Sequence, residues 1–399
     1  MVELSYEYPL FWEWLSFVLR WLHVITAIAW VGSSFYFIAL DLGLQHKDHL
    51  PKGVHGEQWQ VHGGGFYHIQ KYLIAPPNMP EKLIWFKWES YMTLISGSFL
   101  MFVVYYAGAE LLLIDPDIMP LSPNQAILIS LLSLIIGFVL YDFICRLPLG
   151  KNNYYLSLFL FLMLILVSYA YSQLFSGRAA MLHIGAFTAT IMTCNVFFTI
   201  IPNQKKVVAA LKAGNKPDPK LGLQAKQRST HNNYLVLGVI FLMLSNHYPL
   251  AFASPYNWVM APLIFLSGAA VRYFFNQMHS DKGKPYWAFG IAAILFLAVM
   301  WLSSLNHPAN ASEFTENEIV SSIVENRCAM CHAQDPAWPG IIIAPRGVAL
   351  DSIENIMRNT RQIYLQAGIS NAMPPANITA MEPEERAIIK AWYEFQYFK

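Results

Sequence analysis

The fold is decided by a long apolar run near the N-terminus, FWEWLSFVLRWLHVITAIAWVGSSFYFIAL, which covers Phe11–Leu40. Its charged residues are Glu13 and Arg20, and most other positions are aliphatic or aromatic. About 20 apolar residues in a helix are enough to cross the roughly 30 Å hydrocarbon core of a bilayer. Because the run is long and lacks a basic leader and a small-residue cleavage site, we expect it to stay in the membrane as a transmembrane helix.

Seven more apolar runs of sufficient length follow along the chain. They lie at about residues 85–108, 125–145, 152–173, 178–201, 232–253, 257–275 and 286–305. The composition agrees, since 55% of the residues are hydrophobic and only 13% are charged. The sequence therefore predicts an all-α integral membrane bundle of about eight helices over residues 1–305. Asn246, His247 and Pro249 interrupt the outer end of the sixth span.

The distribution of Lys and Arg among the loops predicts the orientation of this bundle. If both of its ends face outward, the inner loops hold Lys47, Lys52, Lys71, Lys82, Arg146, Lys151, Lys205, Lys206, Lys212, Lys216, Lys220, Lys226, Arg228, Lys282 and Lys284. The outer loops then hold only Arg178. Because cytoplasmic loops carry an excess of Lys and Arg, we expect a multi-pass protein of a bacterial inner membrane. Its N-terminus and its C-terminal tail would lie on the periplasmic side.

The tail carries the motif CAMCH, from Cys328 to His332. The thiols of Cys328 and Cys331 are spaced to bond both vinyl groups of one porphyrin, and His332 would then be the proximal ligand of a haem c iron. A zinc half-site is the alternative, but the tail has no further cysteine pair. The motif predicts a class I-like cytochrome c domain over residues 315–399, joined by a linker at 306–314.

A second axial ligand is expected about 40 residues after the motif. Met373 in NAMPP has that spacing, and the following prolines stiffen its loop. Ligation by a methionine would raise the haem potential, so this haem would accept electrons. A buried core methionine is the alternative reading of Met373.

Titratable residues within predicted spans are costly in a membrane and are candidates for function. The predicted topology places His23, His183 and His247 in the outer half of the membrane. Two of them could ligate a haem b, with Arg20 or Arg178 pairing with its propionates. The alternative is that each histidine is an interhelical hydrogen-bonding residue.

The longest loop, at about residues 41–84, contains WQVHGGGFYHIQKY. Its glycines would let the backbone approach a ligand closely. Flat side chains and proton-carrying or cationic side chains surround them: Trp59, His62, Phe66, Tyr67, His68 and Lys71. The other reading of this segment is an aromatic loop at the membrane surface with flexible glycines.

Several stretches together closely resemble the bacterial membrane-bound urate oxidase family, the cytochrome c urate hydroxylases (PuuD family). These stretches are WLHVITAIAWVGSSFYFIALDLGL, WQVHGGGFYHIQKY, WFKWESY, HNNYLVLGVIFLMLSNHYP, CAMCH and NAMPP. The resemblance covers nearly the whole chain. It implies oxidation of urate to 5-hydroxyisourate, with electrons passed to the fused cytochrome c and then to a soluble cytochrome c or a terminal oxidase.

A urate site needs aromatic faces, a cation, hydrogen-bonding groups and a base. With the resemblance in hand, we expect His62, His68 and His231 to be catalytic. Substrate contacts are expected from Trp59, Phe66, Tyr67, Lys71 and Asn232. An outer set contains the same residue types and stays open as the alternative: Arg20, His183, Asn246 and His247.

Urate oxidation removes two electrons, whereas one haem c accepts one at a time, so an intramembrane haem b relay is expected if the site lies inward. Two other classes of protein remain open. One is a quinol-oxidising electron-transfer subunit without a purine site, and the other is a transporter with a redox-sensing tail. The lipid bilayer is the expected environment, and no nucleic-acid partner is expected.

Overall fold

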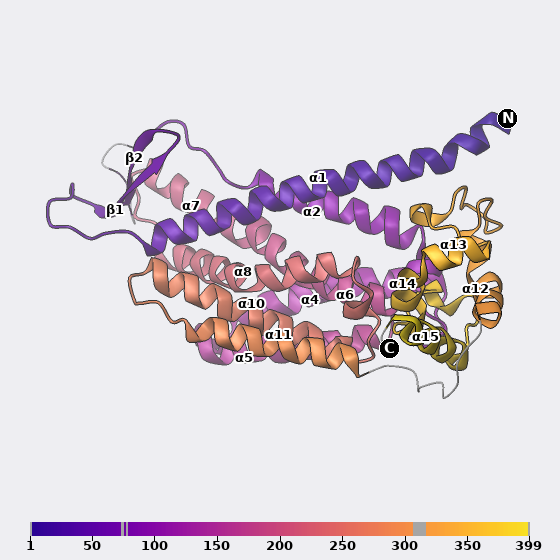
Figure 1. The fold of residues 1–399 in the computed structure, drawn as a ribbon. Coiled ribbons are helices and arrows are strands. Elements are labelled where there is room, and N and C mark those ends of the chain that lie inside the picture. The colour runs from indigo at the N-terminus through magenta and orange to yellow at the C-terminus, as the bar shows by residue number, and fades with distance from the viewer. Residues whose placement is uncertain (1, 73–75, 77–78, 306–316, 398–399) are drawn as a thin grey trace.

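The computed structural model describes residues 2–72, 76, 79–305 and 317–397. The predicted linker at 306–314 lies outside these residues. The N-terminal three-quarters of the chain form a bundle of long helices, with a β-hairpin beyond one end and the C-terminal tail packed at the other (Figure 1).

Within the described residues, the bundle is built from nine α-helices of 12 or more residues, two π-helices and two four-residue helices. They are α1 (Val2–Leu42), α2 (Trp88–Leu100) with the π-helix η1 (Met101–Tyr106), α3 (Ala109–Leu112), α4 (Pro123–Arg146), α5 (Asn153–Ser172), α6 (Gly177–Cys194) with the π-helix η3 (Asn195–Ile200), α7 (Ile201–Lys212), α8 (Pro219–Ser245), α9 (Pro249–Phe252), α10 (Asn257–His279) and α11 (Trp287–Ser304). A short 3-10 turn, η2 (Pro148–Lys151), joins α4 to α5.

Six helices among the described residues are long and apolar enough to cross a membrane. They are α1 from Leu10, α4, α5, the continuous helix Gly177–Lys212, α10 and α11. The second and sixth predicted spans are also helical, as α2–η1 and α8, but they are not among these six. The first half of α8 is polar, and α2 is only 13 residues long before η1 begins. Eight spans therefore stay a prediction.

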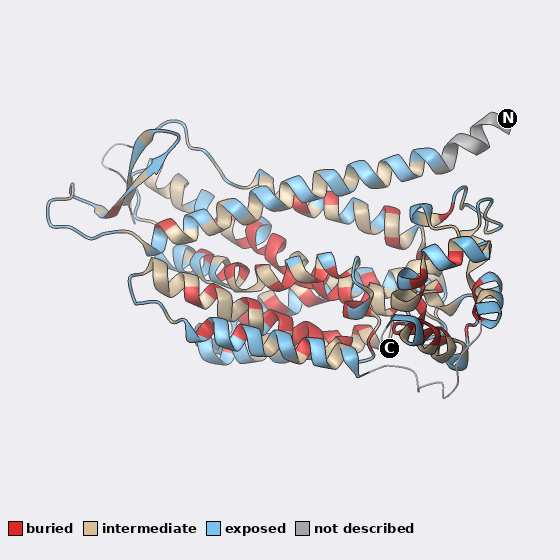
Figure 2. Ribbon diagram, viewed as in Figure 1, coloured by how far each residue is buried: buried red, intermediate tan, exposed pale blue. Residues whose placement is uncertain are grey.

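Burial is concentrated in the middle of the bundle, on α6, α8 and α10 (Figure 2). Large apolar side chains point outward from the peripheral helices; on α1, Trp14 is 61% exposed and Ile28 is 67% exposed. Such a surface would be unfavourable in water but matches a lipid environment. These features support a multi-pass membrane protein, while the identity of the membrane and the orientation remain predictions.

Glycines let the central helices approach each other closely. A Cβ atom on Gly137 of α4 would lie 1.9 Å from the Phe187 ring of α6. One on Gly238 of α8 would lie 2.3 Å from the Phe265 ring of α10. Because lipid provides no hydrophobic drive between helices, small residues at such contacts are a main source of packing energy in membranes.

The prediction of an all-α fold is wrong for the segment after α1, which forms an antiparallel β-hairpin. Strand β1 (Val54–His62) pairs with β2 (Gly65–Tyr72). Gly63 and Gly64 form the two-residue turn with positive φ angles of 57° and 78°. Turns of this kind match the twist of the strands and require left-handed backbone, which glycine adopts without strain. The glycines therefore serve the turn.

The tail has a hydrophobic core of its own. Its elements are α12 (Asn317–His332), η4 (Pro345–Gly347), α13 (Ile353–Arg358), α14 (Thr360–Ile363), the π-helix η5 (Tyr364–Gly368), η6 (Pro375–Asn377) and α15 (Pro383–Tyr397). The first and last helices, α12 and α15, pack together, as expected from the sequence. Val320, Val324, Ile356, Ile389 and Trp392 are among the buried residues between them and their neighbours.

Candidate functional site

The predicted substrate residues of the long loop lie on the exposed β-hairpin. Trp59 is 59% exposed and Phe66 is 77% exposed, and His62 lies beside the turn. Tyr67 is also exposed, and Lys71 pairs with Asp41 at the end of α1. Figure 2 shows the hairpin mostly in the colour of exposed residues.

His68 is held in a network on the hairpin. Its Nε2 lies 2.6 Å from Oε2 of Glu57, and its ring stacks on Trp59 with centroids 4.2 Å apart. Glu57 is only 4% exposed, and its other carboxylate oxygen accepts a hydrogen bond from Nζ of Lys47 at 2.9 Å. The hydrogen bonds from Lys47 and His68 lower the pKa of Glu57. His68 therefore has a structural contact in this hairpin.

The depressed pKa of Glu57 predicts how the hairpin responds to acid. A carboxylate with a lowered folded pKa contributes stability above its unfolded value of 4.5, and this is lost as the pH falls through the folded value. At neutral pH, amide exchange of residues 54–72 should be faster in Glu57→Gln than in the wild type. The ratio of the two rates should approach one in acid. The exposed-site variant Glu81→Gln should match the wild type throughout, and equal exchange of Glu57→Gln and wild type at neutral pH would contradict this role.

His231 and Asn232 lie in a different place, within the bundle at the middle of α8. Nδ1 of His231 is 2.8 Å from the hydroxyl of Tyr141 on α4. That hydroxyl accepts a hydrogen bond from Nδ2 of Asn195, the first residue of η3, at 3.0 Å. The same Nδ2 also donates to Oδ1 of Asn232 at 3.1 Å, and Asn232 donates to the carbonyl of Met192. Three helices thus meet in one polar cluster.

Arg228 extends this cluster by one turn of α8. It is 3% exposed, its Nη2 pairs with Oδ1 of Asp142 at 2.7 Å, and its guanidinium lies 4.7 Å from the Tyr141 ring centroid. The charge pattern alone had assigned Arg228 to a cytoplasmic loop, whereas the helix begins at Pro219 and buries it. Tyr141, Asn195 and Arg228 were not predicted as site residues. In the sequence, only one feature could have pointed to Arg228 and Asn195 as site residues: each is a polar residue within or next to an apolar run.

The structure therefore divides the predicted catalytic and substrate-binding residues into two groups. The hairpin holds His62 and His68, and the bundle holds His231 and Asn232. Among the described residues, no hydrogen bond or ring contact joins one group to the other. Of the two groups, the bundle cluster is the one enclosed by protein.

The three outer histidines have different surroundings. Nδ1 of His23 lies 3.0 Å from the Ser96 hydroxyl, and the absence of a side chain at Gly97 makes room for its ring. His183 is fully buried, with Nε2 2.8 Å from the Ser130 hydroxyl and Nδ1 donating to the Ala179 carbonyl. Haem ligation by Nε2 of His183 would therefore require release of the Ser130 hydroxyl. For His23, the contacts among the described residues involve Nδ1 and leave Nε2 available for ligation.

The remaining outer residues lie at the tail side of the bundle. His247 is exposed after the end of α8. Arg20 is exposed and bonds Ser16 on its own helix, and Arg178 lies 4.7 Å from the ring centroid of Phe252. Tyr105 of η1 connects two members of the outer set: its hydroxyl donates to Oδ1 of Asn246 at 2.8 Å, and its ring meets that of His183 edge-on with centroids 6.1 Å apart. Arg20 and Arg178 both lie near enough to His247 to act on its charge.

The CAMCH residues end helix α12. The four cysteines of the chain are free thiols, and burial raises the pKa of the Cys328 thiol to about 12 and also raises the pKa of Cys331. The ring of His332 donates from Nδ1 to the Val348 carbonyl at 2.8 Å, which fixes the ring and directs Nε2 to a ligand. The donor chemistry fits covalent haem c attachment.

The loop of Met373 is held by Arg386 of α15, which is 7% exposed. Its Nη1 donates to three carbonyl oxygens: Ala367 at 3.1 Å, Ser370 at 3.3 Å and Met373 at 2.8 Å. The amide of Met373 also donates to the carbonyl of Gln366 at 2.9 Å. These bonds fix the backbone on both sides of the expected iron ligand.

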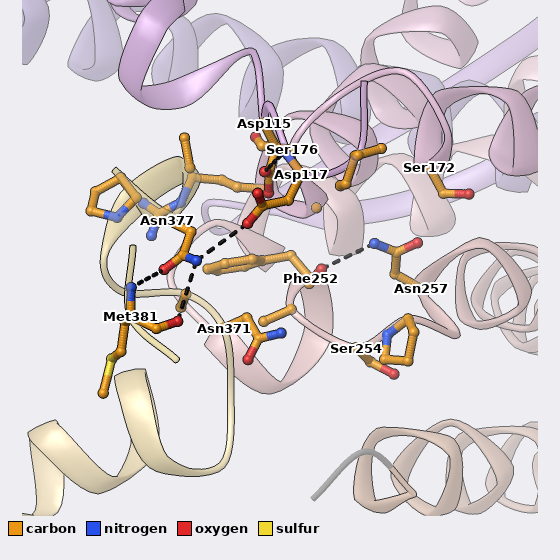
Figure 3. Close-up of a pocket in the computed structure, with 18 of the residues that line it drawn as sticks. Asp115, Asp117, Ser172, Ser176, Phe252, Ser254, Asn257, Asn371, Asn377 and Met381 are labelled. Carbon is orange, nitrogen blue, oxygen red and sulfur yellow. Dashed lines mark hydrogen bonds between the residues drawn. The ribbon is translucent and has the colours of Figure 1, made fainter. Parts of the chain in front are cut away.

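A cavity of about 900 Å³ lies where the tail meets the bundle (Figure 3). Its walls come from the α3–α4 loop, the start of α6, the segment after α9 and the residues around Met373. Nδ2 of Asn377 donates to Asp117 at 3.2 Å and so joins the two parts directly. The Met373 loop therefore faces the bundle.

Comparison with known proteins supports one assignment. The profile of the urate oxidase N-terminal family matches residues 9–303, about three-quarters of the chain. No curated protein and no solved structure matches this sequence. The matched region contains the bundle, the hairpin and the Tyr141–His231 cluster, and it ends before the CAMCH tail. On this match over most of its length, the chain belongs to the urate oxidase N-terminal family.

Proposed function

We propose that this protein oxidises urate to 5-hydroxyisourate within its membrane bundle and passes the electrons to a haem c on its own tail. A soluble cytochrome c or a terminal oxidase would then receive them. The observation that carries this proposal is the order of parts along one chain. A urate oxidase family region is followed directly by a tail with a haem c attachment motif.

The oxidation of urate releases electrons that an electron carrier on the same chain could accept. Urate and one water give 5-hydroxyisourate, two protons and two electrons. The new bond joins a water oxygen to the oxidised ring carbon, and both electrons leave the purine. A bound haem c accepts one electron at a time, so each turnover requires two successive transfers to the tail and two onward transfers from it.

The residues of the tail fit their part in this scheme. Cys328 and Cys331 would hold the porphyrin, and His332 and Met373 would ligate the iron. The Val348 carbonyl orients His332, and Arg386 fixes the Met373 loop. A methionine ligand raises the haem potential and so favours acceptance of electrons from the bundle.

The distance from the His231 cluster to the end of α8 at Ser245 supports a relay. From His231 to Ser245, α8 rises 14 residues, or about 21 Å at 1.5 Å per residue. A haem b on two of His23, His183 and His247, with Arg20 or Arg178 near its propionates, would shorten this path. Tyr171 lies 6.4 Å from Phe187 and 5.7 Å from His183 between ring centroids, so these three rings cover the part of the path beside His183.

Urate added without oxygen tests the proposal in one measurement. In the purified holoprotein, urate should produce the reduced-minus-oxidised spectrum of haem c, because electrons cannot leave to oxygen. A pyridine haemochrome spectrum of the same sample should show both haem c and haem b. Reduction by a quinol but not by urate would contradict urate oxidation. Haem c without haem b would exclude the haem relay.

A further inference from the structure

The polar cluster at the middle of α8 contains buried polar atoms without a protein partner. Among the described residues, Nε and Nη1 of Arg228 and Oδ1 of Asn195 have no hydrogen-bond partner, although each atom is buried. Arg228 is 3% exposed and Asn195 is fully buried. Leaving such groups unsatisfied in a membrane bundle is strongly unfavourable, and more so for a charged donor. A ligand that completes these bonds would remove the penalty.

The buried atoms without a hydrogen-bond partner indicate which chemical groups such a ligand must carry. Arg228 offers three N–H groups and a positive charge, because Nη2 alone is used by Asp142. Asn195 offers one acceptor oxygen. A planar anion with carbonyl oxygens and at least one ring N–H satisfies both. Urate at neutral pH is such a molecule.

The backbone at this point also differs from a regular helix. Asn195 opens the π-helix η3, which interrupts the long helix between Gly177 and Lys212. Single π-helical turns within α-helices occur frequently at functional sites, because they turn side chains away from their regular direction. Here the interruption brings Nδ2 of Asn195 to both Tyr141 and Asn232.

We infer that Arg228 and Asn195, with Tyr141 and His231 beside them, form the purine-anion site of this protein. Arg228 binds the anion, and Asn195 accepts a hydrogen bond from a ring N–H. Oη of Tyr141 lies 2.8 Å from Nδ1 of His231, so the hydroxyl can pass its own proton to the imidazole and take up the proton that leaves the purine, which leaves His231 as the protonated base. This inference rests on the proposed function, and it moves the site away from the hairpin residues.

Urate binding to the dithionite-reduced holoprotein tests the site, because the reduced protein cannot turn urate over. Arg228→Gln should raise the dissociation constant measured by equilibrium dialysis by roughly tenfold to a hundredfold, the usual range for a lost charge-assisted hydrogen bond. Arg146→Gln is the matched control. Arg146 pairs with the other oxygen of Asp142 but its side chain is 70% exposed, so binding should stay within about twofold.

A second variant covers the case in which Arg228→Gln does not assemble. Asn195→Ser keeps the Arg228–Asp142 ion pair and should raise the dissociation constant by about tenfold. Haem c content and the elution volume in detergent show whether each variant has folded. Urate binding like that of the wild type in the folded variants would overturn the inference while urate oxidation stands. If urate neither binds to nor reduces the wild type, the proposed function fails and the inference fails with it.

Discussion

Removing both tail cysteines should abolish urate-driven electron output. In Cys328→Ala/Cys331→Ala the porphyrin loses both covalent bonds, so the chain keeps no stable haem next to His332. Reduction of an added soluble cytochrome c by urate should fall to the background rate. The tail packs at one end of the bundle (Figure 1). Urate binding should stay close to that of the wild type, because Asn232 lies 13 residues, or about 20 Å, before the end of α8 at Ser245.

Met330→Ala is the matched control for this double variant. Met330 lies between the two cysteines on the same helical turn and is 43% exposed. Its replacement changes the surface of α12 without removing a thiol, so haem content and electron output should be retained. If the double cysteine variant still delivered electrons from urate at the normal rate, the tail would not be the exit.

Local patterns in the sequence were enough to predict the parts that depend on local structure. Most helices of the bundle follow the apolar runs, because each membrane span must satisfy its own backbone hydrogen bonds. The CAMCH spacing likewise places two thiols and an imidazole at one helix end. In both cases the information lies within a few turns of one segment.

Two errors came from segments where a local signal had two meanings. Gly63 and Gly64 were interpreted as places for close approach of a ligand, but they form a hairpin turn. Arg228 was counted with the loop cations, but α8 extends inward past it and turns it toward Asp142. A glycine pair between two segments rich in aromatic residues is typical of a hairpin turn. A polar segment directly before an apolar run can be the first half of the same helix.

The composition of the proposed site depends on contacts between distant segments. Tyr141 and His231 are 90 residues apart, and Asn195 lies 54 residues from Tyr141. The spacing of residues within one helix carries no information on such pairs. His231 and Asn232 could be predicted because they stand out within their own helix, whereas their partners became evident only once α4, α6 and α8 were packed.

Replacing Arg386 should release Met373, the proposed sixth ligand of a haem c iron. In Arg386→Met, the carbonyls of Ala367, Ser370 and Met373 lose their shared donor. At about 1 kcal/mol for each lost bond, and more where a carbonyl stays buried, the tail should lose about 3 kcal/mol of stability. The Met373 loop should then move away from the iron, and the haem c potential should fall, because methionine ligation keeps it high.

The absorption band of the iron–sulfur bond in the ferric protein is the direct measurement of this change, and redox titration gives the potential. Arg361→Gln is the control, since Arg361 is exposed on α14 and its loss should affect neither quantity. Because a lower potential weakens the drive for electron transfer from urate, turnover should slow in Arg386→Met while urate binding is unchanged. A normal iron–sulfur band in this variant would show that the loop holds Met373 without Arg386. The buried guanidinium would then contribute to folding of the tail alone.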